Sequence, residues 1–182
     1  TYSGHSGGVL GVAVDESTSK VISGAKDDQV HAIDAATGSQ EWVYDYPDRP
    51  TSIAVSDGSV FAGGYANEVH AIDVSSGNQE WTYSDISNTI DSVAADPSSD
   101  TVLTTGAYSA GIKAVDADTG TEKWQFTTHS DDAVSVAVDS STGTVLTGST
   151  IENLIYAVDV DSGEEQWTYS GHSGAPSDID YV

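Results

Sequence analysis

The sequence contains no cysteine among its 182 residues, so it forms no disulfide, holds no thiolate metal site and offers no cysteine nucleophile. Basic residues are also scarce: 5 Lys plus Arg stand against 29 Asp plus Glu, and the formal net charge is −24. Binding of phosphate backbones or anionic lipid headgroups requires a cationic surface. The composition therefore argues against a nucleic-acid partner and against an anionic membrane surface.

Long apolar runs are absent as well. No stretch approaches the ~20 apolar residues that a membrane-spanning helix needs, and the first residues show no leader of the signal-peptide type. The chain has no methionine, so Thr1 is not expected to follow from an ordinary retained start codon. We expect a processed protein or a part of a longer one, without membrane insertion.

The acidic residues are spread along the chain rather than gathered in a tail. So many carboxylates repel one another in a compact chain at low salt unless dissolved ions screen them. Abundant Asp with little Lys resembles the composition of proteins from extremely halophilic archaea and their viruses, which implies adaptation to concentrated salt. A surface that binds cations is the alternative.

What the sequence does contain is one eleven-residue phrase written four times. Each copy ends in tryptophan, and the four tryptophans lie 39, 43 and 43 residues apart. The first copy reads AIDAATGSQEW and the last AVDVDSGEEQW. The shared positions are Ala32, Asp34, Gly38 and Trp42; Ala71, Asp73, Gly77 and Trp81; Ala114, Asp116, Gly120 and Trp124; and Ala157, Asp159, Gly163 and Trp167.

Each repeat reads as four short strands separated by Gly, Asp, Ser and Asn clusters, with almost no support for helix. The predicted strands are residues 8–14, 20–24, 29–34 and 39–45; 51–55, 59–63, 68–73 and 78–84; 90–95, 101–106, 111–116 and 121–127; and 133–138, 144–148, 154–159 and 164–170. Small and β-branched first strands suit packing about a common axis. The sequence therefore predicts an all-β protein, a β-propeller of four-stranded antiparallel blades. The blades cover approximately residues 4–45, 46–84, 85–127 and 128–170, and residues 171–182 begin a further blade.

The Asp-x-x-Thr/Ser-Gly part of each phrase predicts a tight turn between the third and fourth strands. The carboxylate can accept hydrogen bonds from backbone amides two residues further on, and glycine supplies the positive φ that closes the hairpin. The whole phrase, Ala-x-Asp-x-x-Thr-Gly-x-x-x-Trp, resembles the tryptophan-docking motif of propellers similar to the quinoprotein (PQQ-dependent) dehydrogenases. This resemblance covers all four repeats, and implies that each motif Trp packs between adjacent blades over Gly and Ala of neighbouring motif segments. An aromatic cage for a sugar or a cation is the alternative.

The quinoprotein resemblance also bears on cofactors. In those enzymes PQQ lies in a central funnel formed by many blades, commonly with an adjacent-cysteine disulfide. This chain has no cysteine and half the usual number of blades. We therefore expect no cofactor and no catalytic residues.

A second resemblance, to WD40 repeats, rests on Gly-His pairs at His5 and His172 and on His129 at the matching place of the fourth repeat. WD40 repeats end their third strand in Trp-Asp, whereas this chain has Ile-Asp or Val-Asp there. The second and third repeats lack the histidine and offer Asp48 and Asn88 nearby. We therefore expect that the buried hydrogen-bond network of WD40 blades is not carried over intact.

Residues 1–7 (TYSGHSG) recur unchanged at 168–174, four repeats later. Residues 1–3 then correspond to the tail of an earlier fourth strand, and 177–182 to the first strand of a fifth blade. Because these pieces do not complete one blade, we expect a stretch of a larger ring of about seven or eight blades, continued in a longer chain. The alternatives are a closed four-blade ring and an edge-to-edge homo-oligomer in which two chains form an eight-blade ring.

Five histidines suggest a metal site, but their positions argue against one. His31 and His70 occupy the same third-strand position of successive repeats, where Lys113 and Tyr156 stand in the others. Equivalent positions on different blades are a blade's rotation apart, whereas zinc or copper ligands must converge. Asp-rich turns could hold Ca²⁺ or Na⁺, but none has the Asp-x-Asp-x-Asp-Gly loop with a distal Glu. We expect no metal.

The sequence supports a binding scaffold better than an enzyme. It has no Gly-x-Ser-x-Gly elbow and no phosphate-binding glycine loop, and paired carboxylates are too common to indicate acid–base catalysis. Segments 46–50, 85–89, 108–111 and 150–153 vary between repeats, and binding usually resides in such loops. We predict a non-catalytic module that presents these loops to a protein or glycan partner, extracellularly at the surface of a halophilic cell or on a virion. The alternatives are a fragment of a PQQ-dependent dehydrogenase and an outer-membrane assembly scaffold, the latter at odds with the acidity.

Overall fold

Four antiparallel sheets follow one another along the chain in a computed structural model that describes residues 1–106, 111–129, 132–149, 151–174, 176 and 179. Each sheet has four strands in sequence order, as expected for a propeller blade. The described residues contain no helix, and hence none long and apolar enough to cross a membrane. The predicted fold class, an all-β protein of four-stranded antiparallel blades, is confirmed.

The strand bounds lie close to those predicted. Blade one consists of β1 (Val9–Asp15), β2 (Lys20–Ala25), β3 (Gln29–Asp34) and β4 (Gln40–Asp45), and blade two of β5 (Pro50–Ser56), β6 (Ser59–Gly64), β7 (Val69–Asp73) and β8 (Gln79–Tyr83). Blade three consists of β9 (Ile90–Asp96), β10 (Thr101–Gly106), β11 (Ile112–Asp116) and β12 (Glu122–Phe126), and blade four of β13 (Ala133–Asp139), β14 (Thr144–Ser149), β15 (Ile155–Asp159) and β16 (Glu165–Tyr169). The fourth strands are each shorter than predicted at one or both ends.

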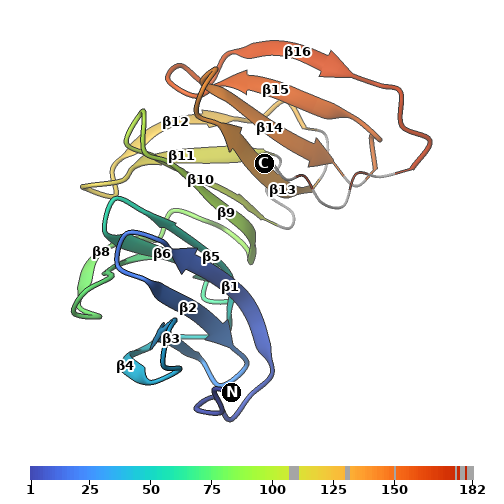
Figure 1. The fold of residues 1–182 in the computed structure, drawn as a ribbon. Coiled ribbons are helices and arrows are strands. Elements are labelled where there is room, and N and C mark those ends of the chain that lie inside the picture. Colours follow the sequence, from blue (N-terminus) through green and yellow to red (C-terminus); the bar gives the residue numbers. More distant parts are fainter. Residues whose placement is uncertain (107–110, 130–131, 150, 175, 177–178, 180–182) are drawn as a thin grey trace.

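The first strands of successive blades contact one another, β1 with β5, β5 with β9 and β9 with β13. Figure 1 shows the result, in which the four sheets succeed one another around an arc and the first and last sheets lie at its two ends. The crowded first strands explain the preference for small and β-branched residues there, because bulkier side chains would push neighbouring sheets apart.

The hydrophobic core lies between the sheets rather than within any one of them. One cluster combines Ile22 and Val30 of blade one with Val60 and Ile72 of blade two, and equivalent clusters join blades two and three and blades three and four. A single blade would leave both of its faces in water. Stability is therefore a property of neighbouring pairs of blades.

An extra residue in each fourth strand turns the motif tryptophan toward the next blade. In β4, Gln40 pairs with Ile33 and Trp42 pairs with Ala32, so Glu41 is left over as a bulge. The same shift recurs in the other three blades, at Glu80, Lys123 and Gln166. The bulge is a structural consequence of the spacing within the repeated phrase, and it sets the direction of the indole ring.

Two residues beyond blade four lie where the first strand of a following blade would lie. A Cβ on Gly148 would meet the Pro176 ring at 2.9 Å, as a Cβ on Gly24 would meet the Pro50 ring at 3.0 Å. The backbone N of Ile179 donates to Ser135 Oγ at 3.0 Å, as the backbone N of Val93 donates to Ser52 Oγ at 2.9 Å. The other residues of the predicted fifth first strand, 177, 178 and 180–182, lie outside the described residues.

Candidate functional site

The aspartate of each repeated phrase closes the turn between the third and fourth strands. Asp34 Oδ1 accepts hydrogen bonds from the backbone N and the hydroxyl of Thr37, at 2.7 and 2.6 Å. The equivalent bonds join Asp73 to Ser76, Asp116 to Thr119 and Asp159 to Ser162. In all four turns the carboxylate bonds the residue three positions further on, and in the last turn Asp159 also accepts the predicted bond from the backbone N two positions on, that of Asp161, at 3.2 Å. Hydrogen bonds from Ser75 and Ser76 lower the pKa of Asp73 to about 2, so the turn holds a permanent negative charge.

Three of the four motif tryptophans lie between blades and bond to the next one. Trp42 Nε1 donates to the carbonyl of Val74 at 2.9 Å, and Trp81 and Trp124 donate to Ala117 and Val160 at 2.8 Å each. The motif alanines, each paired across the sheet with the tryptophan of its own blade, are fully buried. These indole rings thus act in blade cohesion.

The motif glycine of the next blade makes room for each of these rings. A Cβ on Gly77 would meet the Trp42 ring at 2.8 Å, and on Gly120 or Gly163 it would meet the ring of the preceding tryptophan at 2.7 Å. These glycines have φ values of 73°, 68° and 72°, so both the turn and the contact require glycine. The two terminal members of the series differ: Trp167 is 48% exposed, and Gly38 has no atom within 4 Å of its Cβ position.

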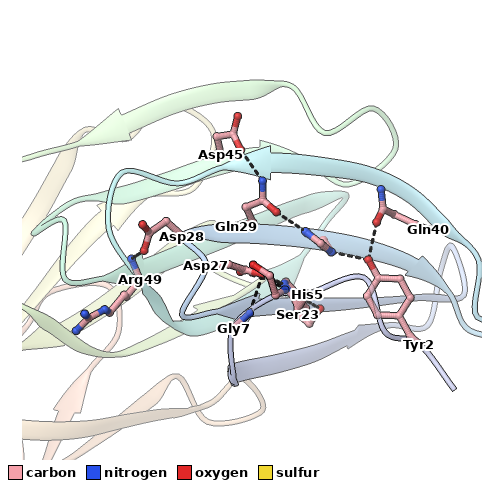
Figure 2. Close-up of polar contacts among 12 residues, drawn as sticks. Tyr2, His5, Gly7, Ser23, Asp27, Asp28, Gln29, Gln40, Asp45 and Arg49 are labelled. Carbon is pink, nitrogen blue, oxygen red and sulfur yellow. Dashed lines mark hydrogen bonds and ion pairs between the residues drawn. The ribbon is translucent and has the colours of Figure 1, made fainter.

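A buried polar cluster fixes the connector that enters blade one (Figure 2). His5 Nδ1 lies 3.1 Å from Asp27 Oδ1, and His5 Nε2 lies 2.8 Å from Ser23 Oγ. Asp27 also accepts hydrogen bonds from the backbone N of Ser6 and Gly7. The Ser, His, Asp order is that of a hydrolytic triad, but Ser23 is only 4% exposed, so a substrate carbonyl has no access to its hydroxyl. The cluster joins the connector to β2 and to the loop that follows it.

A second polar series reaches blades one, two and three, in each case from a tyrosine in the segment that precedes the blade. The Tyr2 hydroxyl bonds His31 Nδ1 at 2.5 Å and donates to Gln40 Oε1 at 2.6 Å. One blade further, Tyr44 makes the same two contacts with His70 and Gln79. His31 and His70 are therefore hydrogen-bonded to tyrosine hydroxyls of the preceding segment, whereas the sequence had shown only that the two histidines occupy equivalent positions.

Between blades two and three, charged side chains occupy the same place. The hydroxyl of Tyr83 donates to Glu122, and Lys113 Nζ lies 3.1 Å from both the Tyr83 hydroxyl and Asp85 Oδ2. Burial opposes the charge on Lys113, but hydrogen bonds to Tyr83, Asp85 and Glu122 outweigh it and raise the pKa of the ammonium group. Burial, together with the bond to Glu122, raises the pKa of the Tyr83 hydroxyl to about 12.

One position in each connector supplies a side chain that fills the end of the blade; we call this residue the plug. It lies four residues before the first strand and is occupied in turn by His5, Tyr46, Ile86 and His129. Tyr46 and His129 are each 2% exposed, and Ile86 is 9% exposed. The sequence analysis offered Asp48 and Asn88 at this place in the second and third repeats. The structure assigns it instead to Tyr46 and Ile86, because burial favours an aromatic or aliphatic side chain.

Blade three contains two buried hydroxyls beside its plug, Ile86. The hydroxyls of Thr104 and Thr105 have no hydrogen-bond partner among the described residues, and both residues line a cavity of about 140 Å³ beside Ile86. Thr104 occupies in β10 the place that Ser23 occupies in β2, where Ser23 bonds the His5 ring. The equivalent hydroxyl of blade four, that of Thr147, is also unpaired although His129 stands at the plug position, so the bond found in blade one is not a general property of a histidine plug.

Metal-binding clusters do not occur in the part of the chain that the structure describes: it contains no group of three or more His, Cys, Asp or Glu side chains that could hold an ion. Asp131 of the Asp131–Asp132 pair lies outside the described residues. Asp27 bonds His5 and backbone amides, and Asp159 closes its own turn.

The variable segments gather at one face of the arc. In every blade the connector and the loop between its second and third strands lie at one end of the sheet, and the two Asp turns lie at the other. We call the first end the variable face; its described parts are residues 4–8, 26–28, 46–49, 65–68, 84–89, 111, 127–129, 132 and 151–154. Of the segments predicted to bind a partner, residues 108–110 and 150 lie outside the described residues.

Two side chains stand out on the variable face. Tyr65 is 48% exposed, and the Arg49 guanidinium lies 5.5 Å from the centre of its ring. The Arg49 side chain is 52% exposed, while its backbone N donates to Asp28 Oδ1 at 3.0 Å (Figure 2). The backbone of Arg49 is thus held in place by Asp28, while the side chains of Arg49 and Tyr65 are accessible to a partner.

Comparison with protein families places the chain among PQQ-type repeats. A family model described as "Outer membrane protein assembly factor BamB" matches residues 3–167. A search of curated proteins finds no match.

Solved propeller structures resemble the chain closely in shape but little in sequence. A structure of a mitotic checkpoint complex matches with a TM-score of 0.85 at 18% identity, over 94% of this chain and 54% of that one. The WD40 repeats of RRP9 match with a TM-score of 0.82 at 13% identity, over 95% and 54%. The computationally designed Ika8 protein matches with a TM-score of 0.85 at 18% identity, over 100% and 55%. The chain spans about half the length of these structures, and the likeness establishes the fold.

Proposed function

Because the chain belongs to the family described as outer membrane protein assembly factor BamB, we propose that it is a β-propeller scaffold that binds a protein partner and catalyses no reaction. The observation that carries this proposal is that repeated residues and variable segments lie at opposite ends of the blades. The repeated Asp, Gly and Trp residues close turns and join blades, whereas the segments that differ between repeats lie together on the variable face. Such a division is typical of a rigid scaffold that presents loops.

Tyr65 and Arg49 are the anchors that we assign to the partner contact. Tyrosine and arginine are enriched among residues that dominate binding energy, because they offer large contact areas together with hydrogen-bond donors. Both side chains are about half exposed, and the guanidinium is already held over the ring. The contact is therefore largely pre-organised.

The negative net charge of the chain indicates the charge that a partner should carry. Lys20 and Lys113 are paired with Glu41 and Asp85, at 2.8 and 3.1 Å, so the excess of 24 negative charges is borne by the remaining carboxylates. A partner that docks on this surface needs basic residues around the anchor site. We also propose an extracellular setting rich in salt, at a cell surface or on a virion, since dissolved ions would screen the carboxylates from one another.

Replacement of Tyr65 tests the assignment of the binding face. The immobilised chain is exposed in molar salt to envelope protein extract from a halophile, and in parallel to a glycan array. We expect a protein to be retained, and Tyr65→Ala to weaken its affinity at least about tenfold, because the substitution removes an anchor. The control is Asp118→Ala on the opposite end of the blades, which should bind as the unmodified chain does.

Three outcomes would contradict the proposal. No retained partner in either format would argue against a binding module, and retention of a glycan alone would replace the protein partner with a carbohydrate. Unchanged binding by Tyr65→Ala would move the contact away from the variable face.

The competing candidate is a fragment of a PQQ-dependent dehydrogenase. The described residues contain no group of three or more His, Cys, Asp or Glu side chains that could hold the Ca²⁺ ion used with PQQ. Addition of PQQ and Ca²⁺ separates the two functions. A bound-cofactor absorption band together with alcohol-dependent dye reduction would favour the enzyme, and silence in both assays would favour the scaffold.

A further inference from the structure

We propose that blade three binds a small neutral ligand, a single aromatic ring that carries one hydroxyl group or one ring nitrogen. The site is the cavity of about 140 Å³ beside Ile86, at the end of the blade that belongs to the variable face. Arg49 and Tyr65, which we assign to the protein partner, lie in the connector and a loop of blade two. The two sites are therefore separate.

The cavity lies where the other blades hold a pair of packed rings. In each of those blades the plug ring packs against a side chain of the third strand that stands at the place of Lys113. The pairs are His5 with His31, Tyr46 with His70 and His129 with Tyr156, with ring centres 3.8, 4.9 and 4.5 Å apart. Blade three has Ile86 and Lys113 at these two positions, and both residues line the cavity. Its lining positions are thus those that hold aromatic rings elsewhere in the chain.

One wall of the cavity carries a buried hydroxyl that needs a partner. Thr104 pairs across the sheet with Lys113, and Lys113 with Gln125, so the three side chains form one row on the same face. All three residues line the cavity, and the Thr104 hydroxyl is unpaired among the described residues. At the same place in blade one, Ser23 Oγ lies 2.8 Å from a ring nitrogen of His5. A ring with a hydroxyl or a nitrogen can satisfy the Thr104 hydroxyl in the same way.

The rest of the lining sets the size of the ligand. The apolar residues Ile86, Ile112 and Phe126 line the cavity, and each is at most 9% exposed. An apolar cavity of roughly 150 Å³ in another protein accepts benzene, so a cavity of this size fits one ring but not two fused rings. Ser87 and Gln125 also line the cavity and are exposed, so a ligand can enter from the solvent.

The charged groups at the cavity are already paired, which favours a neutral ligand. Lys113 Nζ lies 3.1 Å from the Tyr83 hydroxyl, 3.1 Å from Asp85 Oδ2 and 3.2 Å from Glu122 Oε2. An ammonium group has three donors, and these contacts use all of them, so none is left for an anion. The two carboxylates would also repel an anion, and a cation would be repelled by the ammonium group itself.

A methyl-resolved NMR titration of the full chain with phenol tests the site. We expect saturable shifts of the methyl groups of Ile86 and Thr104. The matched probe 1-naphthol carries the same hydroxyl on two fused rings and should give no saturable shift there, because the cavity holds one ring. Absence of saturable shifts with phenol, or binding of 1-naphthol as tight as that of phenol, would overturn the proposal.

Thr104→Val tests the hydrogen bond to the ligand. Phenol and benzene differ by one hydroxyl, and so do Thr104 and its valine variant, so the four dissociation constants isolate the bond between the two hydroxyls. We expect the preference for phenol over benzene to fall about two- to tenfold in Thr104→Val. Thr147→Val is the control, since Thr147 has an equally buried and unpaired hydroxyl at the same place in blade four but does not line the cavity. An unchanged preference in Thr104→Val, or the same fall in Thr147→Val, would overturn the assignment of Thr104.

Two substitutions of the plug test the location of the site. Ile86→Phe places a ring of the chain itself at the plug position, as Tyr46 does in blade two, and should weaken phenol binding at least about tenfold by filling the cavity. Ile86→Val leaves the cavity open and should still bind phenol. Phenol binding that persists unchanged in folded Ile86→Phe, or that is lost in Ile86→Val, would overturn the location.

Discussion

At the residue scale, histidine is the side chain whose role changes most between blades. His5 bonds Ser23 and Asp27, His31 and His70 accept or donate at a tyrosine hydroxyl, and His129 packs edge-on against Tyr156 with ring centres 4.5 Å apart. All four rings are buried at or near a junction between blades, so their protonation bears on stability rather than on catalysis.

The pH dependence of stability follows from two of these rings. Burial lowers the pKa of His31 and of His129 below the usual 6.5, with the nearby His5 adding to the shift at His31. Below pH 6.5 the unfolded chain therefore binds more protons than the folded chain, so the free energy of unfolding should be level above pH 6.5 and fall as the pH drops below it. Denaturant titrations between about pH 7.5 and 5 measure this slope.

His129→Phe isolates one contribution. The phenyl ring can occupy the same buried place between Phe126 and Tyr156 but cannot take up a proton, so the variant should lose part of the slope below pH 6.5. His172→Phe, at an exposed position, serves as the control. An unchanged slope in His129→Phe would show that His129 does not contribute to the pH dependence of the free energy of unfolding.

The plug position shows where residue-level reasoning from the sequence fell short. The sequence analysis noted only that Asp48 and Asn88 lie near the places of the missing histidines, whereas the plugs are Tyr46 and Ile86. Counting four residues back from the predicted first strands would have reached Ile86, but it would have reached Pro47 instead of Tyr46, because β5 begins at Pro50 and not at the predicted residue 51. Burial, which sequence alone does not display, selects the residue type.

At the element scale, the fourth strand determines how blades meet. The bulge at Glu41 and its equivalents turns the tryptophan out of its own sheet, and the motif glycine of the next blade receives it. Strand positions were predictable because alternation and turn residues are local signals. The tyrosine bridges were not, because they join Tyr44 to His70 and Tyr83 to Lys113 across blades, and the partners differ in chemistry from one junction to the next.

Removal of one internal tryptophan tests the energetic weight of a junction. Trp81→Ala should lower the free energy of unfolding by about 3–5 kcal/mol, because the variant loses the packing against the next blade and leaves the Ala117 carbonyl without its donor. Chemical denaturation followed by circular dichroism measures the change. Trp167→Ala is the matched control and should cost about 0.5 kcal/mol or less on dilute chain, where its ring faces water. Equal costs would show that the internal rings do not join blades.

At the scale of the whole molecule, the repeats produce an arc with one variable face and one face of Asp turns. The fold class followed from the sequence because four copies of one motif impose four copies of one structure. The partner could not be predicted, since it depends on the segments that the repeats leave free to vary.

Hydrogen exchange of the four indole N–H groups, followed by NMR, tests most directly the claim that tryptophans join neighbouring blades. We predict slow exchange for Trp42, Trp81 and Trp124, whose Nε1 atoms donate to backbone carbonyls of the next blade at 2.8–2.9 Å, and fast exchange for Trp167. Four indole groups that exchange equally fast would contradict the account.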